Sequence, residues 1–193
     1  MQSVTNGVQT SIDIIKDLAG SDLIGTAAYG TYGYGPADKP SNLNYLTDDM
    51  NTVRSRVGAL QAGMWTSSTN IAQGIDKGVD VLLNSPDARD FAAKIMVLLT
   101  DGNANQTRSN PPSNNASQAK TDALQAATDA HNRGVRIFCI AVGADADQDL
   151  MQKIAQIGEG EFFHAEGDVD AYRQQLQTIF SNLSNKRSVT LMD

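Results

Sequence analysis

The feature that most constrains the fold is the sequence Ile-Met-Val-Leu-Leu-Thr-Asp-Gly over residues 95–102. A strand with consecutive rather than alternating apolar residues is typical of a parallel sheet that helices cover on both faces. Open α/β sheets place their ligand sites at the carboxyl ends of such strands. The pattern therefore predicts that Asp101 brings a carboxylate to this edge for chemistry or metal binding. The alternative is that Asp101 only caps the loop after the strand.

The rest of the chain alternates between helical and strand patterns. Apolar residues recur with helical spacing over residues 1–18, 48–60, 69–82, 117–134, 147–157 and 169–183. Short apolar stretches predict strands over residues 23–29, 43–46, 94–100, 135–142 and 161–164. This alternation predicts one α/β domain over residues 1–185, with a doubly wound, mainly parallel sheet and helices on both faces. Residues 186–193 form a C-terminal tail whose apolar residues have the pattern of a strand.

Composition narrows the classes of partner. The 193 residues carry a formal net charge of −7, which argues against binding to nucleic acid or to an anionic membrane surface. No apolar run approaches the roughly 18 residues of a membrane-spanning helix, so we expect no membrane contact by this segment. Cys139 is the single cysteine, which excludes an internal disulfide, and its place in an apolar strand predicts a buried thiol.

A hydroxyl and a carboxylate are expected to meet at one edge of the sheet. Thr69 starts the helix that leads into the strand before Asp101, so its hydroxyl lies at the end of the helix nearest that carboxylate. Both groups are hard oxygen ligands of the kind that Mg²⁺ prefers. A threonine at a helix start is usually only a cap, so neither signal is strong alone. In this order and spacing, the two predict a metal site with Thr69 and Asp101 as ligands.

With these features the chain resembles the von Willebrand factor type A domain over nearly all of its length. The resemblance rests on Ser-Thr-Asn-Ile-Ala-Gln-Gly-Ile at 68–75, Val-Leu-Leu-Thr-Asp-Gly at 97–102 and Gly-Val-Arg-Ile-Phe-Cys-Ile-Ala-Val-Gly at 134–143. The family builds a metal-ion-dependent adhesion site from an Asp-x-Ser-x-Ser loop, a threonine and an aspartate. Thr69 and Asp101 match the last two, which implies Mg²⁺, or else Mn²⁺ or Ca²⁺, as the cofactor.

The chain departs from the family in lacking any Asp-x-Ser-x-Ser sequence. In the family this loop is commonly followed by a Met and the first helix, and here Met1 opens that helix. We therefore expect an N-terminally truncated domain without its first, central strand and without three metal ligands, which leaves open whether this chain binds the metal. The missing strand would leave two unpaired inner edges, through which two copies could associate as a homodimer.

The tail offers a second hypothesis for the missing strand. Residues 189–193, Val-Thr-Leu-Met-Asp, have an apolar run followed by an aspartate, as the absent strand would. They could fill the gap in their own chain or in a swapped partner and bring Asp193 near the vacant ligand position. The favoured alternative is a tail that continues into a further segment or packs on the surface.

Aromatic side chains are expected beside the metal edge. Tyr29, Tyr32, Tyr34 and Trp65 stand in or next to loops at this edge, and exposed aromatics are common interface anchors. The alternative is simple loop packing, with Trp65 in the core. The remaining partner-binding candidates, Asn70, Gly102 and Asn103, adjoin the two expected ligands. The loops at 30–42 and 103–116 would set specificity, and they are similar to loops of bacterial members found with tight-adherence pili and secretion systems.

The resemblance implies a metal-ion-dependent protein-binding module, in which the cation bridges to an Asp or Glu carboxylate of a protein partner. It also favours a location outside the cytoplasm, in the periplasm or at the cell surface. The alternative is a structural or assembly subunit of a pilus or secretion system with a vestigial metal site. We do not expect an enzyme, because no candidate general base accompanies Asp101.

Overall fold

The computed structural model describes residues 8–9, 12–13, 16, 22–38, 43–61, 64, 68–165 and 174. Three parallel strands form its main sheet in the order β3-β4-β5: β3 (Lys94–Thr100), β4 (Val135–Val142) and β5 (Glu159–Ala165). The other elements are the short strands β1 (Ala28–Tyr29) and β2 (Gly33–Tyr34) and the helices α2 (Met50–Gly58), α3 (Ile71–Asn84), α4 (Ala116–Asn132) and α5 (Gln148–Ile157). The expected mixed α/β fold with a parallel sheet is confirmed.

Each described helix begins at a side-chain cap. Asp49, Asn70, Asn115 and Asp147 each accept a hydrogen bond from the backbone N–H three residues later, which satisfies a donor that the helix itself leaves free. After α4, Gly134 adopts a positive φ of 78°, which glycine tolerates and which lets the chain turn directly into β4.

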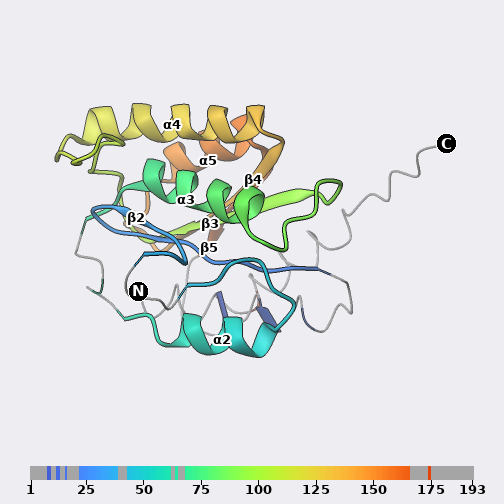
Figure 1. Cartoon of the computed structure of the whole chain (residues 1–193). Coiled ribbons are helices and arrows are strands. Elements are labelled where there is room, and N and C mark those ends of the chain that lie inside the picture. The colour runs from blue at the N-terminus through green and yellow to red at the C-terminus, as the bar shows by residue number, and fades with distance from the viewer. Residues whose placement is uncertain are drawn as a thin grey trace.

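The helices cover the sheet from two sides (Figure 1). In this view α3, α4 and α5 lie above β3–β5, and α2 lies below. The inner face of α4 is a row of alanines, each at most 1% exposed: Ala119, Ala123, Ala126, Ala127 and Ala130. These small side chains let α4 lie close to α3 and α5. Below the sheet, α2 packs Val53 and Val57 into a second cluster together with Ile12 and Ile24.

The expected strands at 23–29 and 43–46 are largely extended segments outside the main sheet. Ile24 and Thr47 form an isolated antiparallel bridge, and the Thr26 N–H donates to the Asn44 carbonyl at 2.9 Å. Only Ala28 and Tyr29 are paired as a strand, with the β2 residues of a tight hairpin. In the described part of the chain, no strand pairs with the side of β3 that faces away from β4.

Several expectations concern residues outside the described set. These are the tail at 186–193, Trp65 and all of the helix at 169–183 except Gln174. Within the expected first helix, the described residues Val8, Gln9, Ile12, Asp13 and Lys16 are all helical. No described helix combines the length and the apolar character needed to cross a membrane.

Candidate functional site

The two expected metal ligands come from neighbouring segments. Asp101 directly follows β3 and is exposed, and Thr69 directly precedes the cap of α3. The hydroxyl oxygen of Thr69 lies 3.4 Å from the position that a Cβ on Gly102 would occupy. The structure therefore places the Thr69 hydroxyl against the residue that follows Asp101, at the carboxyl end of β3.

The loop after β3 holds the backbone of Thr69. The side-chain oxygen of Asn105 accepts a 2.8 Å hydrogen bond from the Thr69 N–H, and the Asn105 N–H donates to the Thr69 carbonyl at 3.0 Å. The Gln106 N–H donates to the same carbonyl at 3.3 Å. No hydrogen bond involves the Thr69 hydroxyl among the described residues, so this oxygen is available to a ligand while its backbone is fixed.

Asn70 is an internal link and not a contact surface. Its side chain is fully buried, and its amide nitrogen donates to the carbonyls of Thr31 at 2.9 Å and Thr107 at 2.8 Å. Its side-chain oxygen accepts from the Gln73 N–H as the cap of α3. The expectation that Asn70 contacts a partner is therefore wrong for this structure, because the loops on both sides of α3 close over it.

Tyr29 packs against its neighbours, which is the alternative to an exposed interface aromatic. Its hydroxyl donates a 2.5 Å hydrogen bond to the Leu99 carbonyl, and burial of this hydroxyl raises the pKa of Tyr29 well above its ordinary value of 10.0. The ring packs on Gly74 of α3, where an added Cβ would lie 2.4 Å from a ring carbon. The absence of a side chain at Gly74 makes the room for this ring.

The other candidates for partner contact lie at the surface to different degrees. Tyr32 is 40% exposed, whereas Tyr34 is partly buried and its pKa is raised by burial and by the nearby Tyr32 and Asp38. Asn103 is exposed, and its amide donates to the Asp145 carbonyl at 2.9 Å. Gly102 is half-buried beside Thr69.

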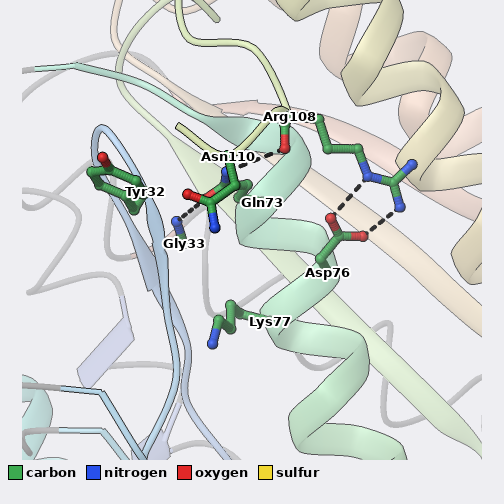
Figure 2. Close-up of a pocket in the computed structure, with 7 residues that line it drawn as sticks. All are labelled: Tyr32, Gly33, Gln73, Asp76, Lys77, Arg108 and Asn110. Atoms are coloured by element: carbon green, nitrogen blue, oxygen red, sulfur yellow. Dashed lines mark hydrogen bonds and ion pairs between the residues drawn. The ribbon is translucent and has the colours of Figure 1, made fainter. Parts of the chain in front are cut away.

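A pocket of about 360 Å³ lies between the β1–β2 hairpin, α3 and the loop at 103–115 (Figure 2). Its lining residues are Tyr32, Gly33, Gln73, Asp76, Lys77, Arg108 and Asn110. The side chain of Gln73 joins the two walls: its oxygen accepts from the Gly33 N–H at 2.9 Å, and its nitrogen donates to the Ser109 carbonyl at 3.0 Å. No pattern in the sequence predicted this pocket.

Arg108 organises one side of the pocket. Its guanidinium donates two hydrogen bonds to Asp76 of α3, at 2.9 and 2.6 Å, and one to Asp129 of α4 at 2.6 Å. The bond to Asp76, followed by that to Asp129, raises the pKa of Arg108 above its ordinary value. The one available signal in the sequence was that Arg108 is the single charged residue of the loop at 103–116.

The donor set at the edge of β3 suits a hard cation that keeps its waters. In the part of the chain that the structure describes, no three His, Cys, Asp or Glu side chains gather to hold a metal. The Asp101 carboxylate and the Thr69 hydroxyl are two oxygen donors of the kind that a hard divalent cation such as Mg²⁺ accepts alongside several waters.

Comparisons with solved structures show the same fold. BatB from Bacteroides thetaiotaomicron aligns with a TM-score of 0.65 and 13% identity, over 94% of this chain and 88% of that one. The PilB minor pilin of Streptococcus sanguinis aligns with a TM-score of 0.67 and 15% identity, over 93% of this chain and 54% of that one. A third structure is proximal thread matrix protein 1 from the mussel byssus, with zinc in its metal-ion-dependent adhesion site. It aligns with a TM-score of 0.61 and 16% identity, over 92% of this chain and 40% of that one.

Sequence comparison identifies the family. No curated protein matches the chain. The family model of the von Willebrand factor type A domain, however, matches residues 5–182, which is most of the chain. The chain therefore belongs to the von Willebrand factor type A domain family.

Proposed function

We propose that this chain is a protein-binding module whose binding depends on a divalent cation held by Thr69 and Asp101, with Mg²⁺ favoured over Mn²⁺ and Ca²⁺. The observation that carries the proposal is the place of the Thr69 hydroxyl, which lies 3.4 Å from where a Cβ on Gly102, the residue after Asp101, would stand. Two hard oxygen donors from separate elements thereby lie in neighbouring positions at the carboxyl end of a parallel sheet, where such folds place their ligands.

The surrounding structure suits a preorganised site. Thr69 stands at the start of α3 and its backbone is fixed by Asn105, while Asp101 follows a strand that is paired along its length with β4. A cation bound there would offer a coordination position to a carboxylate oxygen of an Asp or Glu on a partner protein. The exposed Tyr32 and Asn103, with Gly102, supply surface near this position for further contacts.

Family membership supports a role in protein binding, since domains of this family often bind proteins with the help of a metal. A pilin among the structural neighbours supports a place outside the cytoplasm, in the periplasm or at the cell surface. The net charge of −7 supports a protein partner over a nucleic acid. The proposal assigns binding, and not catalysis, to this edge.

Thermal unfolding of the chain in EDTA and then in excess Mg²⁺ tests the proposal. A site filled at 100 times its dissociation constant adds about 2.7 kcal/mol to the free energy of unfolding, which corresponds to a rise in Tm of about 5–10 °C. Asp101→Ala should abolish this rise. Asp90→Ala, which removes another exposed carboxylate from the loop before β3, is the matched control and should keep the rise.

Substitutions of Thr69 sharpen the test. Thr69→Ser keeps the hydroxyl and should keep the Mg²⁺-dependent rise, whereas Thr69→Val keeps the shape without the oxygen donor and should lose most of it. A rise that persists in both Asp101→Ala and Thr69→Val would place the cation elsewhere. No rise in the unaltered chain would contradict metal binding by this chain.

The alternative function is a structural or assembly subunit whose metal site is vestigial. The observation that favours it is that the described residues gather no three acidic, His or Cys side chains at one point. A partner that binds with the same affinity in EDTA and in Mg²⁺ would support this alternative.

A further inference from the structure

The pocket between the hairpin and α3 contains neither Thr69 nor Asp101 among its lining residues. In Figure 2, Tyr32 lies on the hairpin side, Asp76 and Arg108 lie on the helix side, and Asn110 stands between them in this view. The walls are tied together through the side chain of Gln73, so the pocket is built into the fold.

Both cations that line the pocket are already paired with carboxylates. The Lys77 ammonium lies 2.9 Å from a carboxylate oxygen of Asp38, and together with the Gly35 N–H it lowers the pKa of Asp38 against the opposing effect of burial. Arg108 is paired with Asp76 and with Asp129 on α4. Two cations, Lys77 and Arg108, thus face three carboxylates, so both cations are already paired and no positive charge is left to attract an anion. This distribution of charge favours a neutral ligand over an anionic one.

The pocket keeps both hydrogen-bond donors and hydrogen-bond acceptors that the protein itself does not use. Among the described residues, no hydrogen bond occupies the Tyr32 hydroxyl or the side-chain amide of Asn110, so each can donate and accept. Lys77 uses one of its three N–H groups, on Asp38, and Arg108 uses three of its five. The pocket therefore offers donors and acceptors around the half-exposed ring of Tyr32.

This combination matches the chemistry of a sugar. A pyranose ring presents C–H groups on one face, which pack on an aromatic ring, and hydroxyls at its rim, which both donate and accept hydrogen bonds. The volume of 360 Å³ is at the small end of the range for small-molecule sites, which suits one sugar ring or two. We propose that this pocket binds a neutral saccharide, with Tyr32 as the stacking platform and Asn110, Lys77 and Arg108 as the hydrogen-bonding groups.

The proposal does not rest on the metal-dependent function, so its test is made in EDTA. The full chain is titrated with glucose, galactose, mannose and N-acetylglucosamine, each followed by saturation-transfer NMR. Glucuronate and free glutamate are the anionic probes. At about 10 mM, a site with a Kd of about 1 mM would be mostly filled. At least one neutral sugar should bind.

Variants locate the site. Tyr32→Ala should weaken the binding of that sugar by about tenfold, because it removes the stacking surface. Asn110→Ala should weaken it by about threefold through the lost hydrogen bonds, and it leaves no internal bond broken, so the variant is expected to fold. Tyr45→Ala is the matched control, since Tyr45 is 42% exposed, against 40% for Tyr32, and is not in the pocket. It should leave the Kd unchanged.

Three outcomes would overturn the proposal: no binding of any neutral sugar, binding of glutamate alone, or equal losses in Tyr32→Ala and Tyr45→Ala. If Tyr32→Ala lowers the Tm, its effect on binding is not interpreted, and the result for Asn110→Ala is used instead. An unchanged Kd for the sugar in Asn110→Ala would overturn the assignment of the site. Because all titrations contain EDTA, failure of the metal site leaves this result unaffected, and failure of sugar binding leaves the Mg²⁺-dependent rise in Tm unaffected.

Discussion

The hydroxyl of Tyr29 donates a 2.5 Å hydrogen bond to the main-chain carbonyl of Leu99, two residues before Asp101. The hairpin β1–β2 is thereby tied to the strand that ends at the candidate metal site. The same ring lies against Gly74 of α3, so one side chain joins three elements. This relationship makes Tyr29 a sensitive point for the stability of the whole edge.

Tyr29→Phe should lower the free energy of unfolding by about 1–2 kcal/mol, because the ring still fits while the partly buried carbonyl of Leu99 loses its donor. For a chain of this size the Tm should fall by about 2–8 °C. The measurement is thermal unfolding by circular dichroism. Tyr45→Phe removes a hydroxyl from an exposed tyrosine and should leave the Tm unchanged. Equal Tm values for the two variants would show that the bond to Leu99 contributes nothing.

The raised pKa of Tyr29 predicts how the stability changes with pH. Burial raises the folded pKa above the unfolded value of 10.0, so the contribution is fully present below pH 10 and is lost as pH rises towards the folded pKa. Above pH 10, the tyrosine is deprotonated in the unfolded chain but still protonated in the folded one. The free energy of unfolding therefore falls by up to about 1.4 kcal/mol per pH unit. The stability advantage of the unaltered chain over Tyr29→Phe should therefore shrink between pH 10 and 11.

Urea unfolding at several values between pH 8 and pH 11 measures this effect. Burial also raises the pKa of the Cys139 thiol, but that thiol is present in both proteins and cancels in the difference. Parallel curves for the two proteins over this range would contradict a buried, protonated Tyr29.

Two glycines of α3 give a matched pair. At Gly74 an added Cβ would lie 2.4 Å from a carbon of the Tyr29 ring, whereas at Gly78 the nearest atom, at 2.7 Å, is the terminal methyl of Met96. Replacing a helical glycine with alanine ordinarily stabilises by about 1 kcal/mol. Gly78→Ala should keep most of this gain because the end of Met96 can move. Gly74→Ala should destabilise by about 1–3 kcal/mol because the ring cannot move.

Thermal or urea unfolding of both glycine variants checks this difference. The expected order of stability is Gly78→Ala, then the unaltered chain, then Gly74→Ala. A Gly74→Ala variant at least as stable as Gly78→Ala would mean that the ring does not occupy this place.

Arg108 should fix the loop at 103–115 on the two helices that it joins. Arg108→Met should cost about 1–2 kcal/mol, between the values for exposed and buried pairs, since the side chains of Arg108 and Asp76 are 29% and 40% exposed. Hydrogen exchange of the loop amides should also become faster. Arg133→Met, at the exposed end of α4, is the control and should change neither quantity. Unchanged exchange in Arg108→Met would contradict this anchoring role.

Local patterns predicted the scaffold well. The consecutive apolar residues of β3 and β4 and the alanine face of α4 follow directly from burial, and each appears in the structure where expected. The proximity of Thr69 to the residues after β3 follows from topology, because a helix leading into a parallel strand begins at the strand's carboxyl edge. These predictions needed no knowledge of loop conformation.

The errors arose where loops fold over the scaffold. Asn70 was expected at the surface, but the loop around Thr107, 37 residues away, closes over it. For Tyr29 the sequence pattern allowed either an exposed aromatic or loop packing, and only the space beside Gly74 shows that the ring packs against α3. Arg108 was missed because its partner Asp76 lies 32 residues earlier, on another element. Such pairings depend on long-range packing that spacing in the sequence does not reveal.

The bonds of Asn70 have a consequence for how this edge can diversify. Its amide donates hydrogen bonds to the main-chain carbonyls of Thr31 and Thr107 and not to their side chains. Substitutions of side chains in either loop can therefore leave both hydrogen bonds intact. The chain can therefore change the chemistry that its rim displays without rebuilding the anchor beneath it. Point substitutions in these loops can therefore change which partner is recognised while the backbone conformation of the loops stays the same.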